Sequence, residues 1–195
     1  MDLPKSQFGQ THDAILDAGQ LLFQEKGYRG TSLRDIMAHA GLTIGAFYSH
    51  FDSKSDLFAT CFQRASEAGT QILFAGSAEN GYRKVVEKYL SPVHIGNKEK
   101  GCPLAALLSE LDQFQKENAV PIVDKYVDKF STALLTQGVP KDSTLALMSL
   151  MLGALALARC VKSKELKMRI VTQSLQATDL IVQGLDGQEP EGQIR

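Results

Sequence analysis

TSLRDIMAHAGLTIGAFYSHF, residues 31–51, holds two short helical patterns separated by a glycine. Ser32 followed by Asp35 approximates a capping box, and the apolar residues after it recur at helical spacing. Gly41 can adopt the left-handed conformation that ends a helix in a sharp turn, and Thr43 then starts a second, short helix. The pattern predicts a helix-turn-helix, in which the start of the second helix faces base edges in a DNA major groove.

The residues on both sides extend this pattern into a family resemblance. The matching segments are Ile15–Gly19, Leu22–Tyr28, Gly45–Phe51 and Ser53–Phe58. In this register, collinear and without gaps from Ile15 to Phe58, the chain resembles the DNA-binding domain of the tetracycline-repressor (TetR) family. The rest of the chain resembles that family in length and helical layout. The resemblance implies a homodimeric regulator that binds double-stranded operator DNA and is released by a small-molecule inducer.

The resemblance places the DNA contacts around the two helix starts. The residues expected to contact DNA are Thr31, Ser32, Arg34, Thr43, Ile44, Gly45, Ala46, Phe47, Tyr48, His50 and Lys54. Other roles remain open: capping for Ser32 and Thr43, a place in the core for Phe47, and plain solvent exposure for Tyr48 and His50. Many relatives carry a lysine where this chain has Ile44, and an isoleucine can contact a thymine methyl group but cannot donate to a phosphate.

Composition limits the classes of protein that the chain can be. The 195 residues are 44% hydrophobic with a formal net charge of −1, so any nucleic-acid contact must be local. We expect no run long enough to span a bilayer, no signal segment, and hence a soluble, cytoplasmic protein. The three cysteines lack metal-ligand spacing, so we expect no metal site. We expect no cofactor either.

Helical periodicity without period-two alternation predicts an all-α fold, with an N-terminal three-helix head and a C-terminal helical body for ligand binding and dimerisation. We expect a flexible arm over residues 1–10, the DNA-binding head over 11–55, the body over 56–184 and a disordered tail over 185–195. A helix from Leu57 to Phe74 would link head and body. Further body helices are predicted over 82–93, from Pro103, from Pro121, over 142–161 and over 164–183.

The body is expected to supply both a ligand pocket and a dimer interface. The candidate pocket residues are Phe62, Leu73, Tyr89, Cys102, Leu107, Leu111, Phe114, Tyr126 and Phe130, each of which could equally be plain core. The last two helices look apolar on more than one face, which predicts a four-helix interface between two copies. The candidate interface residues are Met148, Leu152, Leu155, Ile170, Ala177 and Ile181.

Cys102 follows two lysines and precedes a predicted helix start, a setting that lowers a thiol pKa. We therefore expect an electrophile to modify it faster than Cys61 or Cys160, which lie in apolar helices and are expected in the core. Modification of Cys102 is a second possible route of release from DNA. A helical ligand- or partner-binding protein that does not bind DNA stays open as an alternative function. We expect that the chain is not an enzyme: a cysteine-dependent enzyme using His94, Cys102 and Glu110 is the weaker alternative, because no sequence spacing fixes these residues together.

Overall fold

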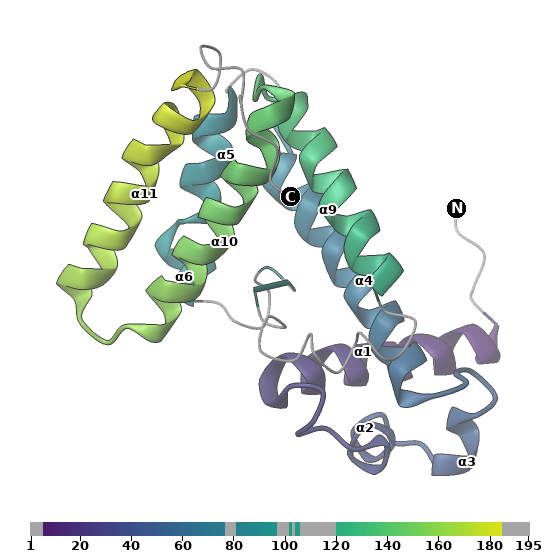
Figure 1. Cartoon of the computed structure of the whole chain (residues 1–195). Coiled ribbons are helices and arrows are strands. Elements are labelled where there is room, and N and C mark those ends of the chain that lie inside the picture. The colour runs from purple at the N-terminus through teal and green to yellow at the C-terminus, as the bar shows by residue number, and fades with distance from the viewer. Residues whose placement is uncertain (1–5, 77–80, 97–101, 103, 106–119, 185–195) are drawn as a thin grey trace, which may run out of the picture. The chain divides into compact units, whose positions relative to one another are not determined.

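The computed structural model describes residues 6–76, 81–96, 102, 104–105 and 120–184 (Figure 1). These residues form helices and turns without a strand among them, so the predicted all-α class is confirmed. The helices are α1 (Gln7–Lys26), α2 (Leu33–His39), α3 (Ile44–Phe47), α4 (Lys54–Phe74), α5 (Gly81–Tyr89), α6 (Pro92–Gly96), α9 (Val120–Leu135), the 3₁₀ helix η1 (Lys141–Ser143), α10 (Thr144–Cys160) and α11 (Lys164–Gly184).

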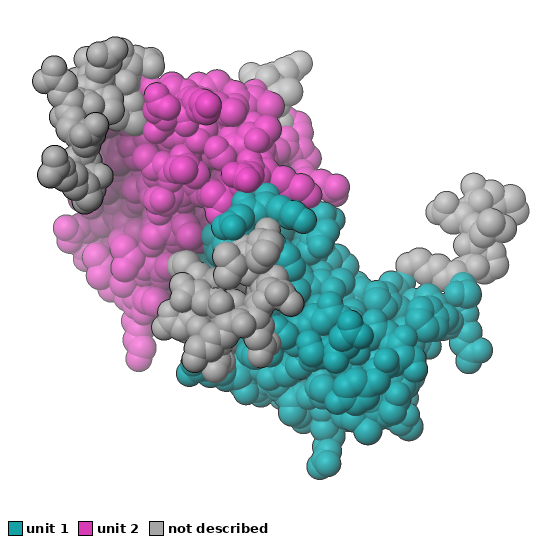
Figure 2. All heavy atoms as spheres, turned by 45° about the vertical axis from the view of Figure 1, so that its right-hand side comes forward, with its two compact units in different colours: residues 1–70, 97–126 teal, residues 71–96, 127–195 magenta. Residues whose placement is uncertain are grey.

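The chain divides into two compact units (Figure 2). Unit 1 comprises residues 1–70 and 97–126, and unit 2 comprises residues 71–96 and 127–195. Helix α4 starts in unit 1 and ends in unit 2. The functional boundary expected between residues 55 and 56 is a different kind of division and stays a prediction.

Helix α1 begins at Gln7, so residues 7–10, which were expected in the flexible arm, are helical. Ser6 caps it, because its hydroxyl accepts a hydrogen bond from the Gly9 N–H at 3.2 Å. At the other end, Gly27 has a φ of 73°, which only glycine adopts readily. The helix therefore ends at Lys26, directly before this glycine.

Helices α1 and α4 approach each other closely in the core of unit 1. A Cβ on Gly19 would lie 3.1 Å from Leu57 Cδ2 and 3.2 Å from Cys61 Sγ, so glycine is what lets α4 pack against α1. Further along, the rings of Phe23 and Phe58 meet edge to face with centroids 4.9 Å apart. The small head is thus built on an apolar contact between its first and last helices.

The predicted capping box and turn are both present around α2. The Asp35 N–H donates to the Ser32 hydroxyl at 3.1 Å, and the Ser32 N–H donates to an Asp35 carboxylate oxygen at 3.2 Å. After α2, Gly41 has a φ of 69°, and the Leu42 N–H returns to the Met37 carbonyl at 2.8 Å. This glycine-terminated hydrogen-bond pattern ends α2 and turns the chain toward α3.

Unit 2 is organised on α10, which packs along α11 and also contacts α5 and α6 (Figure 1). The Ser143 hydroxyl donates to the Ile181 carbonyl at 2.9 Å, which ties the start of α10 to α11. Near the other end of α10, the Arg159 guanidinium donates to the carbonyls of His94 at 2.9 Å and Ile95 at 3.3 Å. Those carbonyls lie at the end of α6, where helical partners run out.

The helix predicted over residues 82–93 is in fact two helices. Helix α5 ends at Tyr89, and α6 starts at Pro92. Proline disfavours a helical conformation at the preceding residue, here Ser91, so the break falls before it. For the helix predicted from Pro103, the structure describes Leu104 and Ala105 as helical, while Pro103 itself lies outside the described residues.

Lys141–Cys160 is long and apolar enough, by length and composition, to cross a membrane. It has 20 residues and a mean hydropathy of 1.6 in its apolar window. The expectation that no run reaches this length is therefore wrong. Since 44% of the window is buried inside the structure, and a core helix of a globular protein passes the same criterion, the finding is weak evidence for a membrane span.

The positive φ of Gly41 predicts a strained alanine variant. We expect Gly41→Ala to lower the free energy of unfolding by about 1–2 kcal/mol, the cost of a left-handed conformation for a residue with a Cβ. Gly45→Ala is the matched control, because its Cβ would meet no described atom within 4 Å and alanine favours a helix by up to about 1 kcal/mol. Urea denaturation measures both, and equal effects would rule out strain at residue 41.

Candidate functional site

The start of α3 is exposed to solvent. Thr43 and Gly45 are exposed, and 48% of Ile44 is exposed. Thr43 precedes the helix without making a side-chain capping bond to any described residue, so its hydroxyl is not used for capping. A hydroxyl, an apolar side chain and bare backbone therefore face solvent together, the combination that can approach base edges closely.

Tyr48 and Phe47 have opposite environments, although both were expected to contact DNA. The Tyr48 ring is 65% exposed, whereas Phe47 is completely buried. The two rings meet edge to face with centroids 5.3 Å apart, so the buried ring supports the exposed one. Phe47 is therefore a core residue rather than a DNA contact in this structure.

Thr31 is also corrected by the structure. It is 1% exposed, and its hydroxyl lies 3.0 Å from the Leu22 carbonyl and 2.8 Å from the Gly27 carbonyl, to either of which it can donate. The hydroxyl thus fixes the turn between α1 and α2 and is not presented to a phosphate.

Ser32 is exposed, but its hydroxyl is committed to α2. It accepts from the Asp35 N–H and donates to the Asp35 carboxylate at 2.6 Å. The Ser32 hydroxyl, followed by its backbone N–H, holds the pKa of Asp35 below its usual range. Arg34 is exposed on the same helix, and Ala46 is half-buried on α3.

His50 packs in an aromatic cluster that sequence reasoning missed. Its ring centroid lies 4.1 Å from that of Phe8 and 5.8 Å from that of His12, and His12 stacks on Phe51 at 4.7 Å. His50 Nδ1 is buried without a hydrogen-bond partner among the described residues. Because α1 starts earlier than predicted, its first turn reaches this cluster.

Lys54 opens α4 and lies against an aromatic ring. Its ammonium is 4.1 Å from the centroid of Tyr28, a cation–π contact. The helix start is capped by Ser53, whose hydroxyl accepts from the Asp56 N–H at 3.0 Å. Lys54 is half-buried, so its stem packs while its charge lies over the ring.

The predicted pocket residues fall into clusters that belong to different units. In unit 1, Cys102 Sγ lies 3.5 Å from the Tyr126 hydroxyl, and Phe62 meets the Tyr126 ring edge to face. Burial, with Cys102 as a secondary cause, raises the pKa of Tyr126. In unit 2, Tyr89 and Phe130 meet edge to face. Leu73 is also buried there, whereas Leu107, Leu111 and Phe114 lie outside the described residues.

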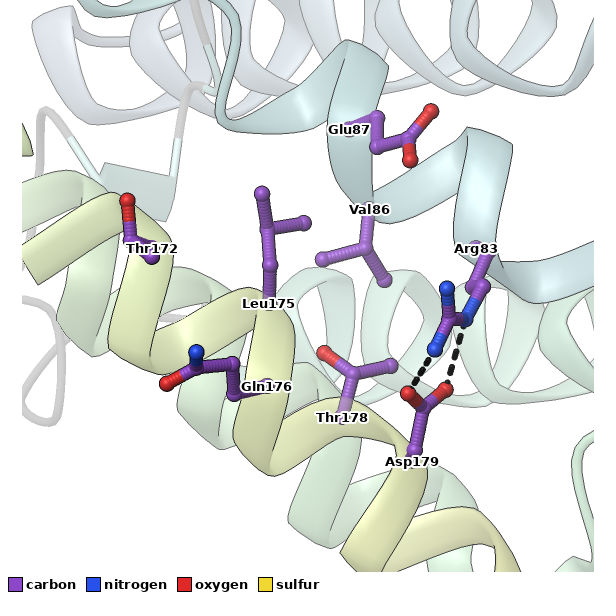
Figure 3. A pocket seen from close by; sticks show the side chains of 8 residues that line it. All are labelled: Arg83, Val86, Glu87, Thr172, Leu175, Gln176, Thr178 and Asp179. Atoms are coloured by element: carbon purple, nitrogen blue, oxygen red, sulfur yellow. Dashed lines mark hydrogen bonds and ion pairs between the residues drawn. The ribbon is translucent and has the colours of Figure 1, made fainter.

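A groove between α5 and α11 in unit 2 was not among the predicted sites (Figure 3). Its volume is about 200 Å³, and its lining residues are Arg83, Val86, Glu87, Thr172, Leu175, Gln176, Thr178 and Asp179. The Arg83 guanidinium donates to both Asp179 carboxylate oxygens, and the Tyr82 hydroxyl donates to the same carboxylate at 3.2 Å. Arg83, followed by Tyr82, holds the pKa of Asp179 below its usual range.

Two of the predicted interface residues belong to the core of unit 2. Met148 is 7% exposed and Leu155 is fully buried, so neither lies on a free surface. The other four, Leu152, Ile170, Ala177 and Ile181, are partly exposed. Apart from Leu150 and from Arg159, whose guanidinium bonds to carbonyls of α6, the exposed or half-buried residues of α10 are Leu145, Ala146, Ser149, Leu152, Gly153, Ala156, Leu157 and Cys160. We call these eight residues the outer face of α10, and none of them carries a charge.

The three thiols differ from their expected environments. Cys160 is exposed at the end of α10, so its assignment to the core is wrong, whereas Cys102 is 7% exposed. Cys61 is buried as predicted; its thiol donates to the Leu16 carbonyl, and burial raises its pKa to about 12. Burial of the Cys102 thiol opposes the fast reaction with an electrophile that was expected from the sequence.

The described residues named for a cysteine enzyme belong to different units. His94 belongs to unit 2 and Cys102 to unit 1, while Glu110 lies outside the described residues. Burial lowers the pKa of His94. The His94 carbonyl accepts a hydrogen bond from the Arg159 guanidinium, a contact that stabilises the fold of unit 2.

Known proteins match both the sequence and the fold. The family "Bacterial regulatory proteins, tetR family" matches residues 15–61. The Transposon Tn10 TetC protein of Escherichia coli is 28% identical over 134 residues, covering 64% of this chain and 68% of its own length. The transcriptional repressor BepR of Brucella suis is 39% identical over 69 residues, 35% of this chain and 33% of BepR. Among solved structures, the reduced form of E. coli NemR is 23% identical with a TM-score of 0.71, covering 89% and 97% of the two chains.

Exposure and pKa predict the order in which the thiols react. In the folded monomer, N-ethylmaleimide should label Cys160 faster than Cys102 or Cys61, because Cys160 is exposed there and the raised pKa of Cys61 suppresses its reactive thiolate. Peptide mass spectrometry over time measures this order, and Cys160→Ser should remove the fast phase. Faster labelling of Cys102 would restore the expectation from sequence.

Proposed function

The chain belongs to the TetR family of DNA-binding transcriptional regulators, and on that premise we propose that it is a homodimeric repressor released from its operator by an inducer. Regulators of this family bind operator DNA and act as dimers, and the relatives named above as regulators are not enzymes. The observation that carries the proposal is the exposed start of α3, on a helix pair fixed by the Ser32–Asp35 capping box and by Gly41.

In the proposed complex, α3 lies in the major groove with Thr43, Ile44 and Gly45 toward the bases. Small or apolar groups at the helix start allow close approach, and Ile44 favours contact with a thymine methyl over hydrogen bonding to guanine. Because the chain has a net charge of −1, affinity for the DNA backbone must come from local groups such as Tyr48 and Lys54.

Substitutions should separate backbone contacts from base contacts. We expect Lys54→Ala to weaken binding to every DNA sequence and to make the dependence of log K on log salt shallower by about one unit, since one phosphate contact is lost. Tyr48→Phe should also weaken binding to all sequences, whereas Thr43→Ala and Ile44→Lys should change which sequence is preferred. Fluorescence anisotropy across a salt series, with sequence selection for the last two variants, measures these effects.

Wild-type protein on a random-sequence duplex is the control for the salt series. If Lys54→Ala leaves both affinity and slope unchanged, the proposed placement of α4 beside the DNA backbone is wrong. The alternative function, a helical partner-binding protein that does not bind DNA, predicts that all four substitutions leave DNA affinity unchanged.

The proposed dimer rests on the outer face of α10. Leu157 is 58% exposed and Leu145 is 54% exposed, and the polar members of the face, Ser149 and Cys160, are small and uncharged. Exposing an apolar face along a whole helix to water costs free energy. This cost is removed when a second copy covers the face. The same two-sidedness explains why α10 has the hydropathy of a membrane span.

A charge on this face should dissociate the dimer without unfolding the chain. Leu157→Asp adds a carboxylate at a side chain that its own unit leaves exposed, so the monomer tolerates it, whereas the interface would bury an unpaired charge. We expect the dimer dissociation constant to rise more than about 100-fold. Val93→Asp is the matched control at an exposed apolar residue of α6, and light scattering measures the mass of both variants. A monomeric wild type, or dissociation by both variants equally, would contradict this interface.

The inducer is proposed to be a small molecule bound by the helical body. The buried aromatic cluster of unit 2 and the α5–α11 groove support such a site, because each joins apolar surface to a few polar groups. Modification of Cys102 remains the second route. It requires a change in which the buried thiol becomes accessible, and a Cys102→Ser variant that responds to an electrophile as the wild type does would remove it. We also propose a cytoplasmic location, where operator DNA is found.

A further inference from the structure

The contact between Lys54 and Tyr28 assigns a role to a residue outside the predicted DNA-contacting set. The Lys54 ammonium lies 4.1 Å from the centroid of the Tyr28 ring. We propose that Tyr28 is a positioning residue, which holds the Lys54 ammonium at the start of α4 for contact with a DNA phosphate. The inference rests on the proposed backbone contact of Lys54 and adds the residue that orients it.

The Tyr28 ring is held by two other aromatic rings. It meets Phe58 of α4 edge to face with centroids 5.3 Å apart, and the centroid of the Phe23 ring of α1 lies 6.0 Å away, with the two ring planes inclined by 26°. Phe23 and Phe58 are each 4% exposed and pack on each other. The ring that supports Lys54 is therefore an extension of the buried core of unit 1.

The backbone around Tyr28 is fixed as well. Thr31 is buried, and its hydroxyl can donate to the carbonyls of Leu22 and Gly27, which precede Tyr28. The Thr31 N–H donates to the Tyr28 carbonyl at 3.4 Å. Thr31 thus contributes to DNA binding indirectly, because its hydrogen bonds stabilise the turn that contains Tyr28.

A lysine at this position needs such support. Lys54 is the first residue of α4, and the partial positive charge of a helix N-terminus repels a cation while attracting a phosphate. A free lysine side chain also samples many rotamers, and fixing one on binding costs conformational entropy. The electron-rich face of Tyr28 offsets the repulsion and restricts the rotamers before DNA arrives, so less free energy is lost on binding.

Tyr28→Leu and Tyr28→Phe separate the ring face from general packing. Phenylalanine keeps an aromatic face under Lys54, whereas leucine keeps an apolar side chain and loses the face. With a random-sequence duplex at low salt, we expect Tyr28→Leu to raise the dissociation constant about 2- to 5-fold, which is the range of an exposed cation–π contact. Tyr28→Phe should stay close to the wild type.

The proposal requires that Tyr28 affects DNA affinity only by positioning Lys54. A double-mutant cycle tests this requirement. In a Lys54→Ala background, Tyr28→Leu should cause no further loss of affinity, whereas a merely structural role of Tyr28 would weaken both backgrounds equally. Equal weakening, or a Tyr28→Leu variant that binds as tightly as the wild type, would overturn the inference. If Lys54→Ala itself binds normally, the backbone contact in the proposed function fails instead.

A measurement on the wild type covers the case in which Tyr28→Leu does not fold. Reductive methylation with ¹³C keeps the lysine charge, and a methylammonium above an aromatic ring shifts upfield in the NMR spectrum. The Lys54 signal, assigned by its loss in Lys54→Arg, should be shifted upfield from the other lysines in free protein and remain so with DNA bound. An unshifted Lys54 signal would overturn the inference.

Discussion

The Leu42 N–H donates a hydrogen bond to the Met37 carbonyl, and the left-handed conformation of Gly41 makes this bond possible. Together they set the direction in which the chain leaves α2. A helix of four residues such as α3 has too few internal hydrogen bonds to be stable alone. Its position must come from the turn before it and from Phe47, which is buried beneath it. The exposed start of α3 is therefore a consequence of one backbone turn and one buried ring.

In the head, a buried residue that supports the fold is followed directly by an exposed residue that is available for contact with DNA. Phe47 is buried while Tyr48 is exposed, and Thr31 is buried while Ser32 is exposed. A short helix such as α3 buries one face, so Phe47 points into the core while Tyr48, at the end of the same helix, points into solvent. The exposed Tyr48 ring packs edge to face on the buried Phe47 ring, so its position is fixed by the core.

Unit 2 is under a different constraint, because α10 has apolar residues on two faces. One face packs on α11, with Met151, Leu147 and Leu155 fully or almost fully buried. The outer face of α10 meets no comparable cover among the described residues of the chain. A helix of this composition is compatible with a protein core, a membrane or a second subunit, and the proposed dimer corresponds to the last of these.

The sequence alone determined the all-α class, the helix-turn-helix, the cap at Ser32 and the turn at Gly41, because these depend on residues within a few positions of one another. Only the tertiary structure decided that the Thr31 hydroxyl serves a turn, that His50 packs between rings of α1, and that Cys160 rather than Cys102 is exposed. It also decided that Leu155 lies in the core and Leu157 outside it. Periodicity shows that a helix has two apolar faces, but which face its own chain covers depends on contacts between residues far apart in the sequence.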